Sequence, residues 1–570
     1  MYRYNAFDRH VLRARAAQFR DQLQRNLQGT LSDDEFRPLR LQNGWYVQRH
    51  APMLRVAVPY GEISSRQLRT LADIADEFDR GFAHLTTRQN VQFNWIALDR
   101  AADVMERLLE ADLHGIQTSG NCIRNITSDV LAGVAEDERI DPRPYAELLR
   151  QWSTLHPEFA FLPRKFKIAI IGADEDRAAV AWHDIGLVLR RNEAGEIGFR
   201  ILVGGGMGRT PIAASEIRPF LPWQQIALYL EAIVRVYNLF GRRDNAYKAR
   251  IKILVKAEGQ RFFDAVNTEF EQLLAGEGRD HLLSPESFAA VAACFETPAG
   301  VREVPERLDP VELGDARLRR WIQRNVHAHK LSGYRAVSLP LKTATQAPGD
   351  ITSAQLRGAA ELADRFSQGE ARISHDQNLL LPWVSVADLE TLYHEARTLK
   401  LADPILGLLS DMITCPGGDF CALANARSIP IAEDIRERFQ DLDDLHDIGD
   451  IDLHISGCMN SCGHHHTGHI GILGVDKDGS EWYQITLGGS DGSRLSGTAA
   501  PGKVIGPSFA ASEVADVVEA LLGTYRQLRM QRERFIDTLR RTGAEPFKAA
   551  AELVRTVTHA GTRTTTQEVA

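Results

Sequence analysis

The sequence predicts an α+β fold built by internal duplication. Residues 63–95 and 351–383 align without gaps at an offset of 288, and 14 of 33 positions are identical. In each copy apolar residues recur at helical spacing, a glycine follows, and a run rich in strand-forming residues comes next. A fainter similarity relates residues 184–208 to 469–492, each with two strand-like runs around a polar turn and a Gly-Gly pair. The chain is therefore expected to contain two copies of a pair of alternating modules.

The first twenty residues are rich in arginine and lack the apolar core of a secretory signal. Their apolar residues fit one face of a helix, so an amphipathic helix is expected. Asp8 and Asp21 argue against an organellar presequence, because such segments are poor in acidic residues. No run of apolar residues is long enough for a membrane span, and the predicted location is the cytoplasm.

Composition narrows the function classes. The chain has 570 residues, of which 44% are hydrophobic and 25% charged; this is ordinary for a globular protein but too long for one hydrophobic core. The net charge of -9 argues against a nucleic-acid binder that works through bulk charge. Scattered Gly, Glu and Pro mark residues 276–310 as the link between the two copies. The composition of residues 558–570 predicts a disordered tail.

Four of the six cysteines form two close pairs. Five residues separate Cys415 from Cys421, and three separate Cys458 from Cys462. Four thiolates can hold either a zinc ion or a [4Fe–4S] cluster. The wide first pair encloses a Pro-Gly-Gly turn, which suits a bulky cluster better than a tight zinc knuckle. A C-x2-C-H haem attachment motif is absent, which argues against a c-type haem.

Neighbouring residues have simpler interpretations. Cys294 lies in an apolar helical run and is predicted to be buried in a helix. The glycine run that begins at Gly204 does not match the dinucleotide-binding pattern, so a nicotinamide site is not expected. Most of the histidines that follow the second cysteine pair are expected to be exposed or hydrogen-bonded loop residues rather than ligands: His464, His465, His466 and His469.

Seven motifs along the chain resemble the sirohaem-dependent sulfite and nitrite reductases over nearly the whole length: MLRVAVP, LTTRQNVQF, GNCIRNI, LPRKFK, LVGGG, TCPGGDFC and SGCMNSCG. The resemblance implies two ferredoxin-like half-domains that alternate with two sirohaem/[4Fe–4S] α+β domains around a pseudo-twofold axis. The implied limits are 1–115 for the N-terminal helix and first half-domain, 116–300 for the first sirohaem-binding domain, 301–400 for the second half-domain, 401–550 for the domain with the cluster cysteines, and 551–570 for the tail.

The resemblance also implies a role for each matching residue. One sirohaem and one [4Fe–4S] cluster per chain are expected. The cluster ligands would be Cys415, Cys421, Cys458 and Cys462, the last of which would also ligate the sirohaem iron. The substrate-binding cations would be Arg55, Arg124, Lys165 and Lys167. The positions lining the sirohaem would be Arg88, Asn90, Gln92, Gly204, Gly205, Gly206, Asn460 and Cys462.

The chemistry of these residues agrees with the implied roles. Sirohaem is rich in carboxylates, which arginine pairs bidentately and the bare amides of a glycine loop can also bind. Sulfite and nitrite are small oxyanions that Arg and Lys can bind, polarise and protonate. Lys165 and Lys167, two apart, would point to one face of a strand. A short basic run by itself is more often a solvated surface, and Arg88 alone could be an ordinary ion-paired arginine. Its replacement by Asp376 in the second copy favours a function.

A covalent feature is also implied. Some members of the family carry a cysteine at the position of Cys122, joined to a tyrosine in a segment similar to GWYVQRH. Tyr46 is the matching tyrosine here. A Tyr46–Cys122 thioether is therefore a hypothesis.

The expected function is that of an assimilatory sulfite reductase, which reduces sulfite to sulfide with six electrons. No flavin or NADPH module is recognisable, so the electron donor is expected to be another protein, either ferredoxin or a flavoprotein subunit. The nearest alternative is a nitrite reductase that forms ammonia with the same cofactors. A more distant alternative is a non-catalytic zinc- or cluster-binding interaction protein that uses the same fold.

Overall fold

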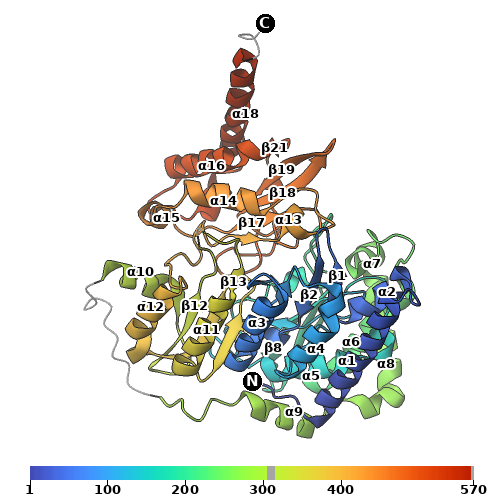
Figure 1. Cartoon of the computed structure of the whole chain (residues 1–570). Coiled ribbons are helices and arrows are strands. Elements are labelled where there is room, and N and C mark those ends of the chain that lie inside the picture. Colours follow the sequence, from blue (N-terminus) through green and yellow to red (C-terminus); the bar gives the residue numbers. More distant parts are fainter. Residues whose placement is uncertain (304–314, 344, 566–570) are drawn as a thin grey trace.

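The computed structural model describes residues 1–303, 315–343 and 345–565. It confirms the predicted α+β fold and its internal duplication, with four mixed or antiparallel sheets covered by helices (Figure 1). None of the described helices is long and apolar enough to cross a membrane.

The first half-domain opens with the predicted amphipathic helix and continues as a strand–helix–strand unit. The buried side chains of the first helix recur every three or four residues, at Leu12, Ala16, Phe19 and Leu23. Ser64 caps the central helix, and Gly81, with a φ of 79°, closes it by donating its N–H to the carbonyl of Ala75. The elements are α1 (Ala6–Leu27), α2 (Asp33–Gln42), β1 (Trp45–Val47), β2 (Pro52–Val56), β3 (Glu62–Ser64), α3 (Ser65–Phe78), β4 (Phe82–Leu85), β5 (Val91–Phe93) and α4 (Ala101–Leu109).

The second half-domain repeats this order with one short helix in place of the first two. Its elements are α10 (Ala316–Asn325), β11 (Val326–His327), β12 (Tyr334–Leu339), β13 (Asp350–Thr352), α11 (Ser353–Phe366), β14 (Glu370–Ile373), β15 (Leu379–Ser385) and α12 (Leu389–Thr398). The two half-domains exchange a strand: β13 pairs with β4 of the first sheet, and β3 pairs with β14 of the second. Together they enclose one hydrophobic core, in which α3 packs against α11.

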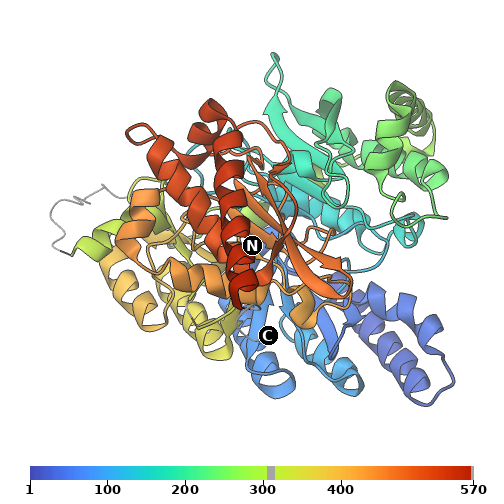
Figure 2. The ribbon, with the colours of Figure 1, turned by 90° about the horizontal axis from the view of Figure 1, so that it is seen from above.

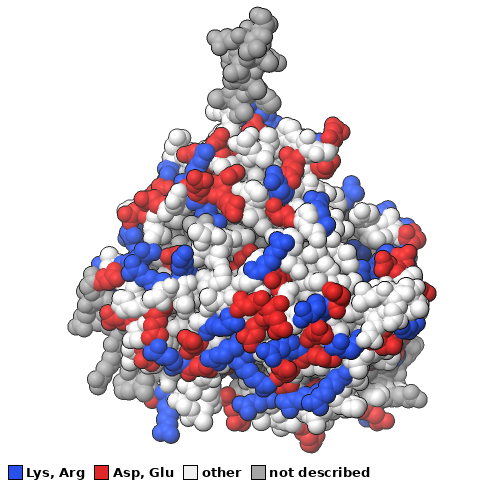
Figure 3. Space-filling view, viewed as in Figure 1, with Lys and Arg blue, Asp and Glu red and all other residues white. Residues whose placement is uncertain are grey.

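Ion pairs on the surface repeat the same symmetry. Arg69 of α3 pairs with Asp364 of α11 at 2.6 Å, and Arg357 of α11 pairs with Asp76 of α3 at 2.7 Å. The offset of 288 relates Arg69 to Arg357 and Asp76 to Asp364, so the two ion pairs are equivalent. The two helices therefore lie across the pseudo-twofold axis from each other. Figure 3 shows blue and red side chains interleaved on the face that carries these helices, with no large area of one sign.

The first αβ domain follows the first half-domain and has its own core. Its sheet has the order β10-β9-β8-β7-β6, in which β6, β7 and β8 are parallel and the rest antiparallel. The elements are β6 (Thr127–Ser128), α5 (Arg143–Ser153), β7 (Ile168–Ile171), β8 (Ile185–Arg191), β9 (Ile197–Val203), β10 (Ser215–Pro222), α6 (Ile226–Phe240), α7 (Ile251–Glu258), α8 (Gln260–Ala275) and α9 (Pro285–Ala292).

The second αβ domain repeats the parallel and antiparallel pattern of the first in β16 to β19 and also has its own core. Its last helix, α18, packs on α16 through Phe547 and Ala551, and its C-terminal end points away from the other domains (Figures 1 and 2). The elements are β16 (Ile413–Thr414), α13 (Gly417–Phe420), α14 (Ile429–Arg438), α15 (Leu442–Ile448), β17 (Leu453–Ser456), β18 (Ile470–Lys477), β19 (Ser480–Leu487), β20 (Lys503–Val504), β21 (Phe509–Ala510), α16 (Val514–Leu528), α17 (Phe535–Thr542) and α18 (Glu545–Thr565).

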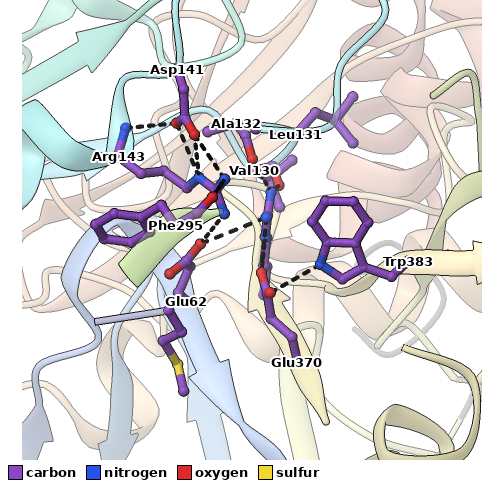
Figure 4. A network of polar contacts seen from close by, with 12 residues as sticks. Glu62, Val130, Leu131, Ala132, Asp141, Arg143, Phe295, Glu370 and Trp383 are labelled. Atoms are coloured by element: carbon purple, nitrogen blue, oxygen red, sulfur yellow. Dashed lines mark hydrogen bonds and ion pairs between the residues drawn. The ribbon is translucent and has the colours of Figure 1, made fainter. Parts of the chain in front are cut away.

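A buried network of charges fastens the exchanged strand β3 to the second copy (Figure 4). Glu62 of β3 pairs with Arg143 of α5 at 2.8 Å, and both side chains are at most 3% exposed. Arg372 of β14 lies 3.6 Å from Glu62 and 2.8 Å from Glu370. Trp383 donates its indole N–H to Glu370 at 3.0 Å. Asp141 pairs with Arg143 at 2.8 Å, so three acids and two arginines lie together where both half-domains meet the first αβ domain.

Three expectations need correction. Cys294 is only half-buried and lies in a short 3₁₀ turn, because the helix α9 ends two residues before it. The segment expected as a simple link contains α9, which packs on α5; the part of it after residue 303 lies outside the described residues. The tail expected to be disordered continues α18 as far as Thr565, and residues 566–570 lie outside the description.

Candidate active site

A cavity lies where the first half-domain, the first αβ domain and the cysteine loops of the second αβ domain meet. It contains ≈ 690 Å³ of space, part of it open to solvent. It is lined by Arg55, His84, Thr86, Thr87, Arg88, Asn90, Gln92, Gln117, Thr118, Arg124, Lys165, Lys167, Gln377, Thr414, Cys415, Pro416, Cys462 and His464. The cavity thus unites all four predicted substrate cations with two of the predicted cluster cysteines.

The arginines of the cavity are held by carbonyl and amide oxygens rather than by carboxylates. Arg55 of β2 donates to the Oε1 atom of Gln92 at 2.9 Å, since the two residues are opposite each other on β2 and β5. Arg124 donates to the carbonyls of Thr118 (2.7 Å) and Gly120 (2.8 Å). Within the described part of the chain, neither guanidinium has a carboxylate within 4.0 Å. Their charge is therefore available to an anionic ligand.

Lys165 and Lys167 lie in an extended segment just before β7, on either side of Phe166, which bridges to Ile123. Both ammonium groups face the cavity, as their spacing predicts. Burial lowers the pKa of Lys165 to about 8, with Arg124 adding to the effect. Burial and the neighbouring charge of Lys165 hold the pKa of Lys167 well below its ordinary value. Cys462 lines the same cavity as both lysines.

Arg88 is held on several sides by its neighbours. Its guanidinium donates to the carbonyl of Asn125 at 2.7 Å and to the hydroxyl of Thr127 at 3.0 Å, and it contacts the ring of His183. Burial and the charge of Arg124 lower the pKa of Arg88 to about 9, which still leaves it protonated at neutral pH.

Sequence patterns missed several residues of this site. Asp184 accepts the backbone N–H of Lys167 at 2.8 Å and pairs with Arg250 at 2.7 Å. Lys252 is buried and donates to the carbonyls of Gly206 and Thr210. The sequence signal for Arg250 and Lys252 is the basic run of residues 248–252. This run lies far along the chain from the family motifs, so sequence reasoning did not connect it with the site.

Two of the four predicted cluster cysteines, Cys415 and Cys462, line the cavity. The loops that carry the two cysteine pairs are in contact, because the backbone of Gly457, next to Cys458, meets Gly417 and the Cys415 sulfur. Burial raises the pKa of Cys415 to about 12 and that of Cys458 to about 11. Thiols of this kind ionise when a metal supplies positive charge. The backbone N–H of Gly457 donates to the Cys415 sulfur at 3.2 Å, which stabilises a thiolate there.

This arrangement fits a cluster better than a single ion. Among the described residues, no group of three or more His, Cys, Asp or Glu side chains is placed to hold one metal ion. A zinc ion needs its ligands within bonding distance of one point, whereas a [4Fe–4S] cluster spreads four thiolates over separate iron atoms. Gly417, with a φ of 55°, and Gly457 let the cysteine loops pass close together, since a Cβ at Gly457 would meet the Cα of Gly417 at 2.7 Å.

The glycine loop after β9 is built for close approach of another group. A Cβ on Gly205 would collide with the carbonyl oxygens of Ala181 and His183, and one on Gly206 would lie 2.8 Å from the guanidinium of Arg250. The loop also touches the second cysteine pair, because the hydroxyl of Ser461 donates to the Met207 sulfur at 3.7 Å. Bare amides, buried cations and a nearby cysteine fit a carboxylate-rich macrocycle, which these groups would hold.

Not all predicted residues line the cavity. Arg88, Asn90, Gln92 and Cys462 do, whereas the glycine loop lies outside its wall. Asn460 is exposed and hydrogen-bonds to Cys458.

The two residues of the crosslink hypothesis have different surroundings. Tyr46 lies beside Arg55, whose Cζ atom is 5.4 Å from the ring centre. Cys122 lines a separate, more apolar cavity, and its thiol donates to the carbonyl of Ser119 at 3.2 Å.

The histidines after the cysteines are less exposed than expected. His469 is fully buried and donates to the hydroxyl of Ser496 at 3.0 Å. The ring of His466 lies 2.9 Å from the carbonyl of Gly208, and His464 lines the cavity. His465 is fully buried, and neither ring nitrogen has a hydrogen-bond partner within the described part of the chain.

The second copy lacks an equivalent set of cations. Asp376 stands where the first copy has Arg88, and Asp452, the residue before β17, stands where Lys167 precedes β7. Burial and the neighbouring Asp411 raise the pKa of Asp376 to about 7. Acidic residues would repel an anionic cofactor, so the positions of the second copy that correspond to Arg88 and Lys167 do not suit one.

The comparisons with known proteins agree with this geometry. The sequence model of the nitrite and sulphite reductase 4Fe-4S domain matches residues 119–274 and 409–557. The model of the nitrite/sulfite reductase ferredoxin-like half domain matches residues 46–111 and 336–399. The four matches follow the duplication and cover most of the chain.

Relatives with different named substrates match similarly well. The chloroplastic ferredoxin–nitrite reductase of Zea mays is 29% identical over 460 residues, which cover 77% of this chain and 73% of that protein. Sulfite reductase [ferredoxin] 1 of Mycolicibacterium paratuberculosis is 26% identical over 505 residues, 87% of this chain and 83% of that protein.

A solved structure shares the fold. The structure of the Mycobacterium tuberculosis NirA protein has a TM-score of 0.73 at 24% identity, covering 91% of this chain and 92% of that one. Matches to both domain models over most of the chain, the cysteine constellation and the cationic cavity lead to one conclusion. The chain belongs to the nitrite and sulfite reductase family, and it is an oxidoreductase with a sirohaem and a [4Fe–4S] cluster as its cofactors.

Proposed function

We propose that this oxidoreductase is an assimilatory sulfite reductase that converts sulfite to sulfide with six electrons. One observation carries the proposal: half-buried cations without carboxylate partners face a cavity whose wall includes Cys462. Uncompensated buried charge is costly unless an anion completes the site. A small oxyanion, held beside a carboxylate-rich cofactor, supplies the missing charge.

The proposed roles of the cations follow from their positions. Lys165, whose charge lowers the pKa of Lys167, and Lys167 itself bind neighbouring oxygens of one oxyanion. Arg124 and Arg55 are fixed by hydrogen bonds to carbonyl and amide oxygens, so their remaining N–H groups are oriented before the substrate arrives. Such preorganised donors stabilise the charge that develops as each oxygen leaves.

The lysines also serve as the proton source. Oxygen leaves the substrate as water, so each step needs two protons at an oxygen atom. A donor works best when its pKa lies near the operating pH. Lys165, with a pKa of about 8, meets this condition, and Lys167 is lowered further still.

The bound cofactors supply an open iron position for the substrate and a route for single electrons from the cluster. Both copies of the duplicated unit help to orient Cys462, the proposed ligand of both cofactors. The hydroxyl of Thr87 donates to the carbonyl of Cys462 at 2.9 Å. His375, the counterpart of Thr87 in the second copy, in turn contacts the Thr87 carbonyl at 3.1 Å.

Nitrite is the second candidate substrate, because relatives named as ferredoxin–nitrite reductases are 29% identical to this chain. The same cations suit both anions. The test is the ratio of kcat/KM for sulfite to that for nitrite, measured with the purified holoenzyme and one artificial donor. A ratio below one would make nitrite reduction to ammonia the function instead.

The proposed donor is ferredoxin, which the names of both nitrite- and sulfite-reducing relatives contain. A flavoprotein subunit is the alternative. Reduced ferredoxin should sustain turnover in the absence of any flavoprotein; turnover with a flavoprotein alone would assign the donor otherwise. The location in the cytoplasm stays a prediction.

Variants of the cavity test the site itself. Lys167→Met should keep the iron content and the haem-type absorption spectrum but lose the spectral change on sulfite addition. It should lower kcat/KM by roughly 100-fold or more, the range of a lost acid or charge-stabilising donor. Lys248→Met is the matched control, because this lysine is exposed and outside the cavity. Equal activities of the two variants would remove Lys167 from the site.

A further inference from the structure

A second cavity lies in the other half of the molecule, between the second half-domain and helix α14. It contains ≈ 1000 Å³ of space, part of it open to solvent. Its apolar wall is formed by Ile405, Phe439, Leu442 and Leu445. None of the roles assigned to the first cavity involves this region.

Buried polar groups face this second cavity. Lys342 is 3% exposed and Arg436 is 7% exposed, and both line it. The ammonium of Lys342 donates to the carbonyl of Asp376 at 2.7 Å, and Arg436 donates to the carbonyl of Gln346 at 2.8 Å. Ser410 is 6% exposed, and its hydroxyl has no hydrogen-bond partner within the described residues. A buried hydroxyl beside two buried cations is costly unless an acceptor reaches it.

Carboxylates lie near these groups both in the interior and at the opening of the cavity. Asp376 and Asp411 lie behind Lys342 and favour its charged form, while Arg436 disfavours it. Asp403 is paired with Arg317 at 2.9 Å. The carboxylates of Glu433 and Glu437 are on exposed residues at the opening, where water screens them.

The duplication shows what kind of group belongs over Arg436. Helices α5 and α14 begin the same number of residues after β6 and β16, which places Arg150 at the position of Arg436 and Glu147 at that of Glu433. In the first copy the N-terminus covers this position. The rings of Tyr2 and Tyr4 lie 5.5 and 5.1 Å from the Arg150 guanidinium.

A carboxylate completes that arrangement. Glu147 of the same helix pairs with Arg150 at 2.6 Å, and Asp8 of the N-terminal segment adds a second carboxylate at 3.7 Å. In the second copy, Glu433 stands in the place of Glu147 but is exposed, and Arg436 lines the second cavity. The rings and the second carboxylate that the N-terminal segment brings to Arg150 thus mark the place that a ligand of the second cavity would take.

We propose that this cavity is a binding site for an aromatic carboxylate. The carboxylate accepts hydrogen bonds from Arg436 and the Ser410 hydroxyl, and Lys342 adds a second positive charge. The ring packs on Phe439 and the neighbouring leucines, as aromatic rings do in apolar pockets. The site is separate from the cavity that contains Cys462, since the two share no lining residue.

Isothermal titration calorimetry on the full-length holoenzyme tests the proposal. The probes are 4-hydroxyphenylacetate, benzoate and indole-3-acetate, with 4-hydroxyphenylacetamide as a neutral counterpart. At least one carboxylate should bind one site per chain with a Kd below ~1 mM, and the amide should bind at least tenfold more weakly. Arg436→Gln should weaken carboxylate binding at least tenfold. Arg438→Gln is the matched control, because Arg438 is on the same helix but points to Asp516 and Glu519 and should leave binding unchanged.

A second variant keeps the test decisive if Arg436→Gln does not fold. Ser410→Leu changes no charge and fills the floor of the cavity, so it should also weaken binding tenfold or more. The proposal is overturned if none of the three carboxylates binds, or if the variant that folds binds as the parent does. It is also overturned if saturating sulfite displaces the probe, since the probe would then occupy the first cavity.

Discussion

Gln89 and Gln377 occupy the same position in the two copies, and each crosses into the other copy. The side-chain amide of Gln89 donates to the carbonyl of Ile373 at 3.1 Å, and that of Gln377 donates to the carbonyl of Leu85 at 3.0 Å. The offset of 288 relates both the donors and the acceptors. Each glutamine also accepts a backbone N–H of the αβ domain of its own copy, from Ser128 and Thr414 respectively.

Replacing either glutamine should therefore destabilise the whole core of the half-domains. Gln89→Ala leaves the N–H of Ser128 and two carbonyls without their partners, at about 1–3 kcal/mol for each unsatisfied buried group. We expect a loss of roughly 3 kcal/mol in the free energy of unfolding for Gln89→Ala, and a similar loss for Gln377→Ala. Chemical denaturation measures it. Gln24→Ala, at an exposed position of α1, should change stability by less than about 0.5 kcal/mol; equal losses in all three variants would contradict the assigned role.

Glu62→Gln should be strongly destabilising, because it removes one partner from the buried network of Figure 4. Breaking a buried ion pair costs about 3–5 kcal/mol, since the remaining charge stays buried. The control is Glu106→Gln: Glu106 pairs with Arg20 on the surface, where such pairs contribute about 0–1 kcal/mol. A thermal shift no larger for Glu62→Gln than for Glu106→Gln would show that the network adds no stability.

The activity should fall as the pH rises through the pKa of Lys165. The protonated ammonium is the active form, and in the protein without cofactor its pKa is about 8. A bound anionic cofactor favours the ammonium and raises this pKa, so kcat/KM should begin to decline at or above pH 8, by up to tenfold per pH unit. In Lys165→Arg the guanidinium stays protonated across this range, and the decline should shift to higher pH. A decline at the same pH in this variant would assign the titration to another group.

Gly205→Ala should reduce the sirohaem content without removing the cluster. The new Cβ collides with two backbone carbonyl oxygens, those of Ala181 and His183, so the glycine loop must move away from its present path. We expect a loss of haem absorbance relative to the iron of the cluster. Gly523→Ala, in α16 with nothing within 4 Å of its Cβ, is the control and should keep the full absorbance. Normal sirohaem content in Gly205→Ala would show that the loop does not shape the cofactor site.

A Tyr46–Cys122 thioether remains a prediction from resemblance. The described structure places the tyrosine beside Arg55 and the thiol on another cavity. Peptide mass spectrometry of the holoenzyme decides the question: the crosslink removes two hydrogen atoms and joins two tryptic peptides. Separate, unmodified peptides would exclude it, and a Cys122→Ser variant should abolish any joined peptide.

The sequence by itself determined the repeated unit and the inventory of the site. Helical spacing and the glycine after α3 are local patterns, so they predicted the elements of both half-domains. Cysteine spacing needed only positions along the chain and predicted a metal centre, and the resemblance of seven motifs to a known family predicted the four cations that line one cavity with Cys415 and Cys462. The disorder expected for the tail and the burial expected for Cys294 failed, because composition alone does not determine where a helix ends.

Only the tertiary structure decided how the copies are joined. The exchange of β3 and β13 leaves every local pattern unchanged, since a strand of given sequence pairs equally well with its own sheet or with that of its twin. The pairing of Asp184 with Arg250 and the bond from Thr87 to Cys462 join residues 66 and 375 positions apart. Such contacts depend on where whole modules dock, and docking depends on the summed burial and charge balance of surfaces drawn from distant parts of the chain.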